Sequence, residues 1–173
     1  SHTLSISAAS LRLCGEGKYL LLAGILAGLM PLLHAHGFFA VMMVSAAMAL
    51  VFFSWDWLAF FIPAGILSLP QALWLSSTGT RTSLFKLHLG WATGENFPKF
   101  LALNFGLFWL LLVVALFFQS ARIRRFYAPF VLCFIVPNVV LLAPWPWDNI
   151  KVLLYWYLLS CPLVVGFIVR LVQ

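Results

Sequence analysis

The stretch VLLYWYLLSCPLVVGFIV, residues 152–169, decides the fold class, because it is almost wholly apolar and contains no charged side chain. A helix needs roughly 20 mainly apolar residues to cross the hydrocarbon core of a bilayer, with about 17 as the short limit. Lys151 precedes this stretch and Arg170 follows it, so cations lie at both of its ends. The sequence therefore predicts a transmembrane helix here.

The composition of the rest of the chain supports a membrane protein. Hydrophobic residues make up 64% of the 173 residues and charged residues only 8%, against roughly half and about a quarter in soluble domains. A soluble fold of this length could not bury so much apolar surface and still remain dispersed. The sequence thus excludes a soluble or disordered protein and predicts an all-α, polytopic transmembrane helical bundle.

About six spans are expected, because six apolar runs follow one another along the chain. Their approximate bounds are 19–33, 37–54, 57–75, 100–118, 127–143 and 152–169. The first two runs form either a tight hairpin of two short helices or one helix followed by a re-entrant segment. Residues 1–18 are interpreted as a surface segment or a truncation end, and residues 19–173 as a single transmembrane domain with an outer loop at 76–99.

The positive charges predict an orientation. Arg122, Arg124 and Arg125 share one short loop, and such density marks a cytoplasmic loop. Alternation of the spans then makes both termini cytoplasmic, in what we expect to be a bacterial inner membrane. The net charge of +6 is scattered over the ends of apolar runs, so it predicts topology and lipid contact rather than a nucleic-acid partner. Residues 83–91 of the outer loop fit either a short amphipathic helix or an irregular loop.

Two histidines, His34 and His36, stand at the outer end of the first run. They can be ordinary interfacial residues, contacts for a substrate or phosphate, or ligands of a metal or a pigment. No third ligand lies near them in the sequence, which weakens the case for a metal.

The most unusual segment is WPWDNIK, residues 145–151. Its two prolines stiffen the backbone, and Trp145 and Trp147 suit the headgroup level or stacking on a sugar ring. Asp148 can cap the last helix and pair with Lys151. The segment, including Asn149, is therefore either a sugar- or phosphate-binding loop or a helix cap within an aromatic belt.

Other polar and small residues lie within or beside the apolar runs. Asn104, Pro137 and Asn138 are expected to have structural roles in packing between helices, with Asn138 able to satisfy a carbonyl that Pro137 frees. Gly24 and Gly28, four residues apart, predict a close-packing helix face.

A resemblance to a known class rests on three segments. Residues 144–151, PWPWDNIK, followed by Tyr155 and Trp156, resemble the Pro-Trp-x-Trp-Asp-Asn-x-Lys signature of bacterial GT-C-like polytopic glycosyltransferases. Residues 104–108 resemble the Asn-x-Gly-Leu helix start of these proteins, and residues 24–36 resemble a further segment. The likeness runs from about Lys18 onward and corresponds to the C-terminal part of such enzymes.

The resemblance implies sugar transfer from a polyprenyl-phosphate donor on the outer face of a membrane, with a divalent metal if the chain is catalytic. The acidic motif that such enzymes carry in their first outer loop is absent here, and Glu95 is the one weak candidate for a catalytic residue. We therefore expect binding of a lipid-phosphate-linked sugar without catalysis by this chain alone, with other membrane subunits or a missing N-terminal part as partners. The alternative is a noncatalytic small subunit of a larger membrane complex that packs lipid or pigment. A small transporter ranks last, because no span carries a charge at its centre.

Overall fold

The computed structural model describes residues 17–78, 86–89, 97–142 and 146–173. These residues are mostly helical, as the sequence predicts, with one short pair of strands. The chain divides into two compact units, with the boundary between residues 80 and 81.

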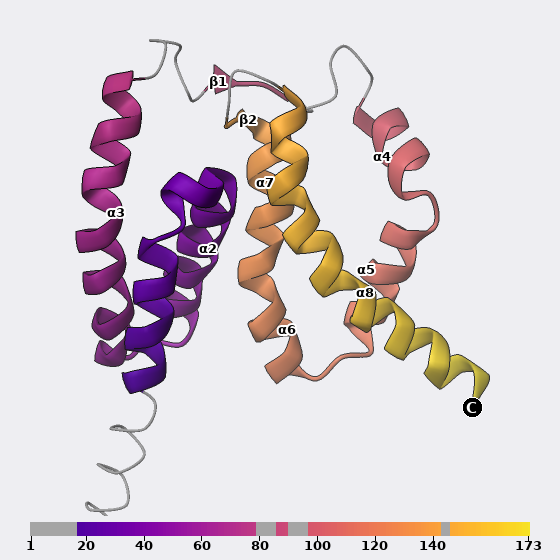
Figure 1. Cartoon of the computed structure of the whole chain (residues 1–173). Coiled ribbons are helices and arrows are strands. Elements are labelled where there is room, and N and C mark those ends of the chain that lie inside the picture. The colour runs from indigo at the N-terminus through magenta and orange to yellow at the C-terminus, as the bar shows by residue number, and fades with distance from the viewer. Residues whose placement is uncertain (1–16, 79–85, 90–96, 143–145) are drawn as a thin grey trace, which may run out of the picture. The chain divides into compact units, whose positions relative to one another are not determined.

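The described part of unit 1, residues 17–78, contains three α-helices joined by two tight reversals of the chain (Figure 1). The helix Gly17–Gly28 comes first, followed by α2 (Pro31–Val51) and α3 (Leu58–Thr78). A short 3-10 turn, η1 (Trp55–Trp57), joins α2 to α3. Ser54 begins this turn, because its hydroxyl oxygen accepts a hydrogen bond from the Asp56 backbone N–H at 3.1 Å.

The first reversal matches the hairpin alternative rather than a single helix with a re-entrant segment. Pro31 starts α2, where its missing N–H costs no helical hydrogen bond. His34 interrupts α2 with an extended conformation, φ −157° and ψ 82°. Gln71 of α3 stabilises the reversal, since its side chain donates to the Gly28 carbonyl at 2.7 Å and accepts from the Leu32 N–H at 3.3 Å.

The close-packing face predicted from Gly24 and Gly28 is confirmed. A Cβ atom on Gly24 would collide with the backbone of Phe60, and one on Gly28 would lie 2.8 Å from the Leu67 Cβ. Both glycines are buried, and the core around them is formed by Ala27, Phe60 and Ala64. The absence of side chains at positions 24 and 28 thus lets the Gly17–Gly28 helix approach the backbone of α3.

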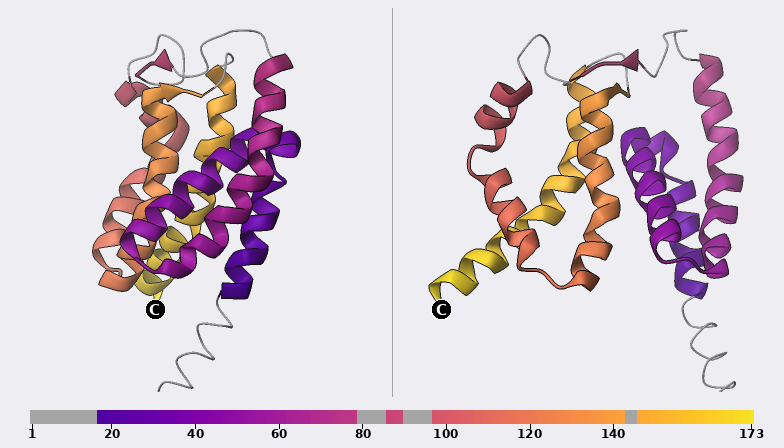
Figure 2. Two further views of the ribbon diagram at one scale, coloured as in Figure 1. Left: turned by 90° about the vertical axis from the view of Figure 1, so that its left-hand side faces the viewer. Right: turned by 180° about the vertical axis from the view of Figure 1, so that it is seen from behind.

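Unit 2 contains the remaining helices and the two strands (Figures 1 and 2). Its elements in chain order are β1 (Lys86–Leu87), α4 (Phe97–Phe105), α5 (Phe108–Phe117), α6 (Ala121–Tyr127), η2 (Ala128–Val131), α7 (Leu132–Val139), β2 (Val140–Leu141), η3 (Pro146–Asn149) and α8 (Ile150–Val172). Helix α8 packs against both α7 and α5.

The strand pair replaces the amphipathic helix considered for residues 83–91, as far as that segment is described. Lys86 pairs with Leu141 and Leu87 with Val140 in antiparallel register. The His88 N–H donates to the Val139 carbonyl at 2.8 Å. The chain that leaves α7 is extended and offers unpaired backbone groups, and hydrogen bonding to them favours a strand over a helix at residues 86–87.

The expected span at residues 100–118 is broken. Helices α4 and α5 meet at an angle of 86°. Gly106 lies at the break with φ +51°, a left-handed conformation that glycine adopts without a steric cost. The segment 104–108 therefore ends one helix and begins another.

The six-span count is not confirmed. Within the described residues, three helical segments are long and apolar enough to cross a membrane, or four if α4 and α5 together form one broken span. The three are Pro31–Val51, Trp55–Ser77 and Trp147–Val172. The Gly17–Gly28 helix is too short by this measure, and the run at 127–143 is divided among α6, η2, α7 and β2. These long apolar helices indicate a membrane protein.

The core of unit 2 is aromatic and centres on Trp156 of α8. The Trp156 ring lies 4.5 Å from the ring of Phe134 and 5.4 Å from that of Phe105, measured between centroids. The Tyr127 and Ser160 hydroxyl groups form a buried hydrogen bond of 2.7 Å one turn further along α8. These contacts hold α4 and α7 against the first half of α8.

Candidate functional site

The polar part of the candidate site lies at the start of α8. The Lys151 Nζ and the Asp148 Oδ1 are 2.8 Å apart, so the predicted pairing of these two residues is confirmed. The Lys151 side chain is 46% exposed and that of Asp148 25% exposed. The pair is therefore accessible, and its lysine can still contact an anion from solvent.

Asp148 does not cap α8, contrary to the prediction. The residue before α8 is Asn149, which has a helical conformation (φ −62°, ψ −27°) and makes no side-chain cap hydrogen bond. The reason is that η3 runs directly into α8. A capping side chain needs an extended residue at the helix start, and here the chain is already helical.

Asn149 has a structural role instead of the predicted contact with a ligand. It is completely buried. Its Oδ1 accepts from the Leu142 N–H at 3.0 Å, while its Nδ2 donates to the Pro137 and Val140 carbonyls, both at 2.8 Å. The Asn149 amide thus ties the start of α8 to the end of α7 and to β2, and it fixes the position of the Asp148–Lys151 pair.

Of the other predicted residues, Trp147 lies in this loop. Trp147 is 68% exposed beside Asp148, in the position that a stacking or interfacial indole requires. Trp145 and Glu95 lie outside the described residues.

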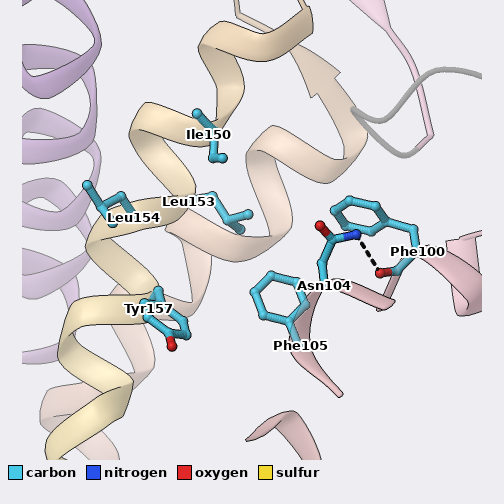
Figure 3. Close-up of a pocket in the computed structure, with 7 residues that line it drawn as sticks. All are labelled: Phe100, Asn104, Phe105, Ile150, Leu153, Leu154 and Tyr157. Carbon is cyan, nitrogen blue, oxygen red and sulfur yellow. Dashed lines mark hydrogen bonds between the residues drawn. The ribbon is translucent and has the colours of Figure 1, made fainter. Parts of the chain in front are cut away.

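An apolar pocket lies beside the first turns of α8 (Figure 3). It has a volume of about 230 Å³ and lies between α4 and the first two turns of α8. Its lining residues are Phe100, Asn104, Phe105, Ile150, Leu153, Leu154 and Tyr157. Leu154 follows Lys151 by three residues, so these two side chains are neighbours on the helix surface.

Asn104 supplies polar atoms to this pocket. Its Nδ2 donates to the Phe100 carbonyl of its own helix at 2.9 Å, and its Oδ1 points away from that bond toward α8 (Figure 3). Asn104 is exposed and its hydrogen bond lies within its own helix, so within the described part of the chain it makes no hydrogen bond of the kind expected for packing between helices. Its hydrogen bond stabilises the end of α4 just before the Gly106 break.

Asn138 and Pro137 are buried in α7, as expected for structural residues. Pro137 leaves the carbonyl of Cys133 without its helical donor. The Asn138 Nδ2 donates instead to the next carbonyl, that of Phe134, at 2.7 Å. The prediction that Asn138 satisfies the carbonyl freed by Pro137 is therefore wrong, because the side chain reaches back to the residue four positions before its own.

His34 and His36 lie in unit 1, and their ring centroids are 6.4 Å apart. The His34 Nδ1 accepts a hydrogen bond of 2.7 Å from the Gly37 N–H. His34, whose own backbone is extended, therefore caps the part of α2 that follows it. Among the described residues, no group of three or more His, Cys, Asp or Glu side chains is placed to hold a metal ion. His34 thus has a clear structural role at the reversal.

The prediction that His34, Glu95, Trp147, Asp148 and Lys151 share one cleft stays a prediction. Trp147, Asp148 and Lys151 do lie together at the start of α8. His34 belongs to the other unit, and Glu95 lies outside the described residues.

The sequence reasoning missed the apolar half of the site. The helical spacing of Ile150, Leu153, Leu154 and Tyr157 marks one face of a helix. This signal is hidden in an apolar run, where almost every position is hydrophobic. The role of Gln71 has no local sequence signal, because its partners Gly28 and Leu32 lie 43 and 39 residues away from it in the chain.

Comparisons of this chain with protein-family models, with curated proteins and with solved structures find no match.

Proposed function

We propose that this chain binds a lipid-phosphate-linked sugar as the membrane-embedded portion of a GT-C-like glycosyltransferase, on the outer face of a bacterial inner membrane, with both termini cytoplasmic. The phosphate contacts Lys151, the sugar lies by Trp147, and the first part of the lipid chain enters the pocket between α4 and α8. The observation that carries the proposal is that an accessible ion pair and an apolar, aromatic-lined pocket both lie at the start of the same helix, α8.

The chemistry of such a ligand fits this arrangement. Ligand sites combine an apolar lining with a few polar groups that fix orientation. The pocket of about 230 Å³ is below the ~300 Å³ typical of whole-ligand sites. It therefore suits a segment of a long chain whose remainder extends into the surrounding lipid. Lys151 offers three N–H donors, and Asp148 uses only part of this capacity.

A noncatalytic subunit of a larger membrane complex is the second candidate. The observation in its favour is the low burial of the two long helical segments of unit 1, each with 17% of its apolar window buried. Such exposed helices require lipid or partner helices around them. This role is compatible with lipid binding at α8 but requires no sugar.

The test compares two leucines of α8 that have similar exposure. Leu154 is 51% exposed and lines the pocket, whereas Leu158 is 59% exposed and does not line it. A tryptophan at position 154 fills the pocket, and we expect Leu154→Trp to weaken binding of a polyprenyl-phosphate sugar roughly tenfold, since overpacking costs about 1–3 kcal/mol. Leu158→Trp should bind like the wild type. Binding is measured by ligand-induced quenching of tryptophan fluorescence in detergent or by native mass spectrometry.

The proposed contact between Lys151 and the phosphate is tested with Lys151→Gln. The control is Lys86→Gln, which removes an equal charge from β1. We expect Lys151→Gln to reduce the preference for polyprenyl-phosphate sugar over the corresponding polyprenol, and Lys86→Gln to leave it unchanged. Equal binding of the phosphorylated and unphosphorylated lipids by the wild type would contradict the proposal and favour the subunit role.

A further inference from the structure

A second groove lies at the other end of unit 2, between α5 and α6. It has a volume of about 440 Å³ and is lined by Val113, Leu116 and Phe117 of α5 and by Arg124 of α6. This volume falls within the range of ~300–1,000 Å³ that ligand sites usually have. Three apolar side chains and one guanidinium group thus form an amphipathic groove.

Other arginines cluster around the same corner. Arg122 and Arg125 lie on α6 with Arg124, and all three residues are exposed. Arg170, near the end of α8, donates to the Phe118 carbonyl at 3.4 Å, directly after α5. The rings of Phe118 and Phe167 lie 5.3 Å apart and hold the end of α5 against α8. The end of α5 is therefore held to the last part of α8 through Phe118, while α6 follows it directly in the chain.

No acidic side chain balances these charges within the described part of unit 2. Its one described acid, Asp148, precedes the first turn of α8 and pairs with Lys151, whereas Arg170 lies in the last turn of that helix. Among the described residues of unit 2, Arg122, Arg124, Arg125 and Arg170 thus place positive charge near an apolar groove without an acidic partner. An anionic partner with an attached apolar chain is complementary to both features.

We propose that the α5–α6 groove binds one anionic phospholipid. An acyl chain lies along Val113, Leu116 and Phe117, and the phosphate contacts Arg124, with the neighbouring arginines adding to the attraction. Arginine binds phosphate through two parallel N–H donors, which gives directional contact as well as charge. Basic pockets between transmembrane helices are a recognised way of binding acidic headgroups. This site is separate from the proposed sugar-lipid site on α8 and does not depend on it.

The experiment measures lipid binding to the purified full chain by native mass spectrometry, with phosphatidylglycerol and phosphatidylcholine of identical acyl chains. We expect the wild type to prefer phosphatidylglycerol. Arg124→Gln should reduce that preference about fivefold, in line with the ~1 kcal/mol attributed to each basic residue near an acidic lipid surface. Arg124→Lys should retain part of the preference, and the charge-matched control Lys86→Gln should retain all of it.

A matched pair of valines tests the apolar half of the groove. Val113 is 43% exposed and lines the groove, whereas Val114 is 41% exposed and does not line it. Val113→Trp should reduce phosphatidylglycerol binding, and Val114→Trp should leave it unchanged. Because both positions are similarly exposed, a difference between the two variants reports on the groove rather than on folding.

Several results would overturn the proposal. Equal binding of the two lipids would show that charge has no part, and equal loss in both valine variants would show that the groove has none. Competition by glycerol phosphate at the same concentration as the lipid would identify a soluble anion as the ligand. A dimer that forms without lipid and is broken by Val113→Trp would identify a second copy of the chain as the occupant.

Discussion

A single amide, that of Asn149, connects the candidate site to the rest of unit 2. It hydrogen-bonds the carbonyls of Pro137 and Val140 and the N–H of Leu142, at the end of α7, in β2 and just after β2. Buried backbone groups left without a hydrogen bond cost about 1–3 kcal/mol each. The position of Lys151 two residues later depends on this network.

Asn149→Ala is expected to lower the free energy of unfolding by about 3 kcal/mol. The reason is that the substitution leaves the Pro137 and Val140 carbonyls and the Leu142 N–H unpaired. Asn104→Ala is the control, since Asn104 is exposed and makes one hydrogen bond within its own helix, and it should cost under about 1 kcal/mol. Denaturant unfolding in mixed micelles, followed by circular dichroism, measures both. Equal small effects would show that the Asn149 network does not stabilise the loop.

The sequence predicts that Asn149 lies in an unusual loop, but it does not predict which groups the Asn149 side chain contacts. A PWPWDNIK segment at a helix start identifies the loop as unusual, and it correctly predicts the Asp148–Lys151 pair because these residues lie one helical turn apart. The partners of Asn149 are seven to twelve residues earlier. Which way an asparagine points across such a separation depends on the tertiary fold.

At the scale of helices, the Gly17–Gly28 helix and α3 approach each other through glycine. Gly24 faces the Phe60 backbone, which cannot move aside as a flexible side chain can. Interfaces between membrane helices depend on such small residues, because van der Waals packing is a main source of their stability.

Gly24→Ala is expected to destabilise the protein by about 1–3 kcal/mol through overpacking. Gly65→Ala, on α3, is a matched control, because a Cβ at Gly65 meets nothing within 4 Å. Alanine also favours a helix over glycine by about 1 kcal/mol, so Gly65→Ala should be neutral or slightly stabilising. Thermal unfolding in detergent compares the two variants. Similar stability of both would contradict the close packing seen at Gly24.

The elements show why some helices could be predicted and others could not. The run at 152–169 lacks charge, and it forms most of α8 despite Pro162 and Gly166, which does not adopt a positive φ. The run at 100–118 is as apolar, but Gly106 permits a left-handed residue and an 86° bend. Hydropathy measures transfer into lipid and is insensitive to such a break. Strand β1 could not be predicted from the sequence, because its partner β2 lies within an apolar run whose hydropathy predicts a transmembrane helix.

At the scale of the whole molecule, the proposed function requires binding but no chemistry by this chain. Sugar transfer needs a positioned base, or an acid beside the donor phosphate, often with a metal. Asp148 is already paired with Lys151. The remaining candidate, Glu95, has no second acid near it in sequence.

We therefore expect no glycosyl transfer by the purified chain supplied with a polyprenyl-phosphate sugar, a divalent metal and a range of acceptors. Release of polyprenyl phosphate, followed by thin-layer chromatography of radiolabelled donor, measures the activity. Transfer that is abolished by Glu95→Gln would contradict this expectation and identify Glu95 as the base.

In the proposed complex, a lipid-phosphate-linked sugar lies with its phosphate at Lys151 and its chain between α4 and α8. The most direct measurement is photolabelling with a polyprenyl-phosphate sugar that carries a diazirine in its first isoprene units, followed by peptide mapping. We expect labels on residues 97–105 and 150–157, and we expect unlabelled ligand to reduce this labelling. The labelling should be lost in Leu154→Trp and retained in Leu158→Trp. Labels spread over exposed apolar residues of both units, or insensitive to competition, would contradict the proposed complex.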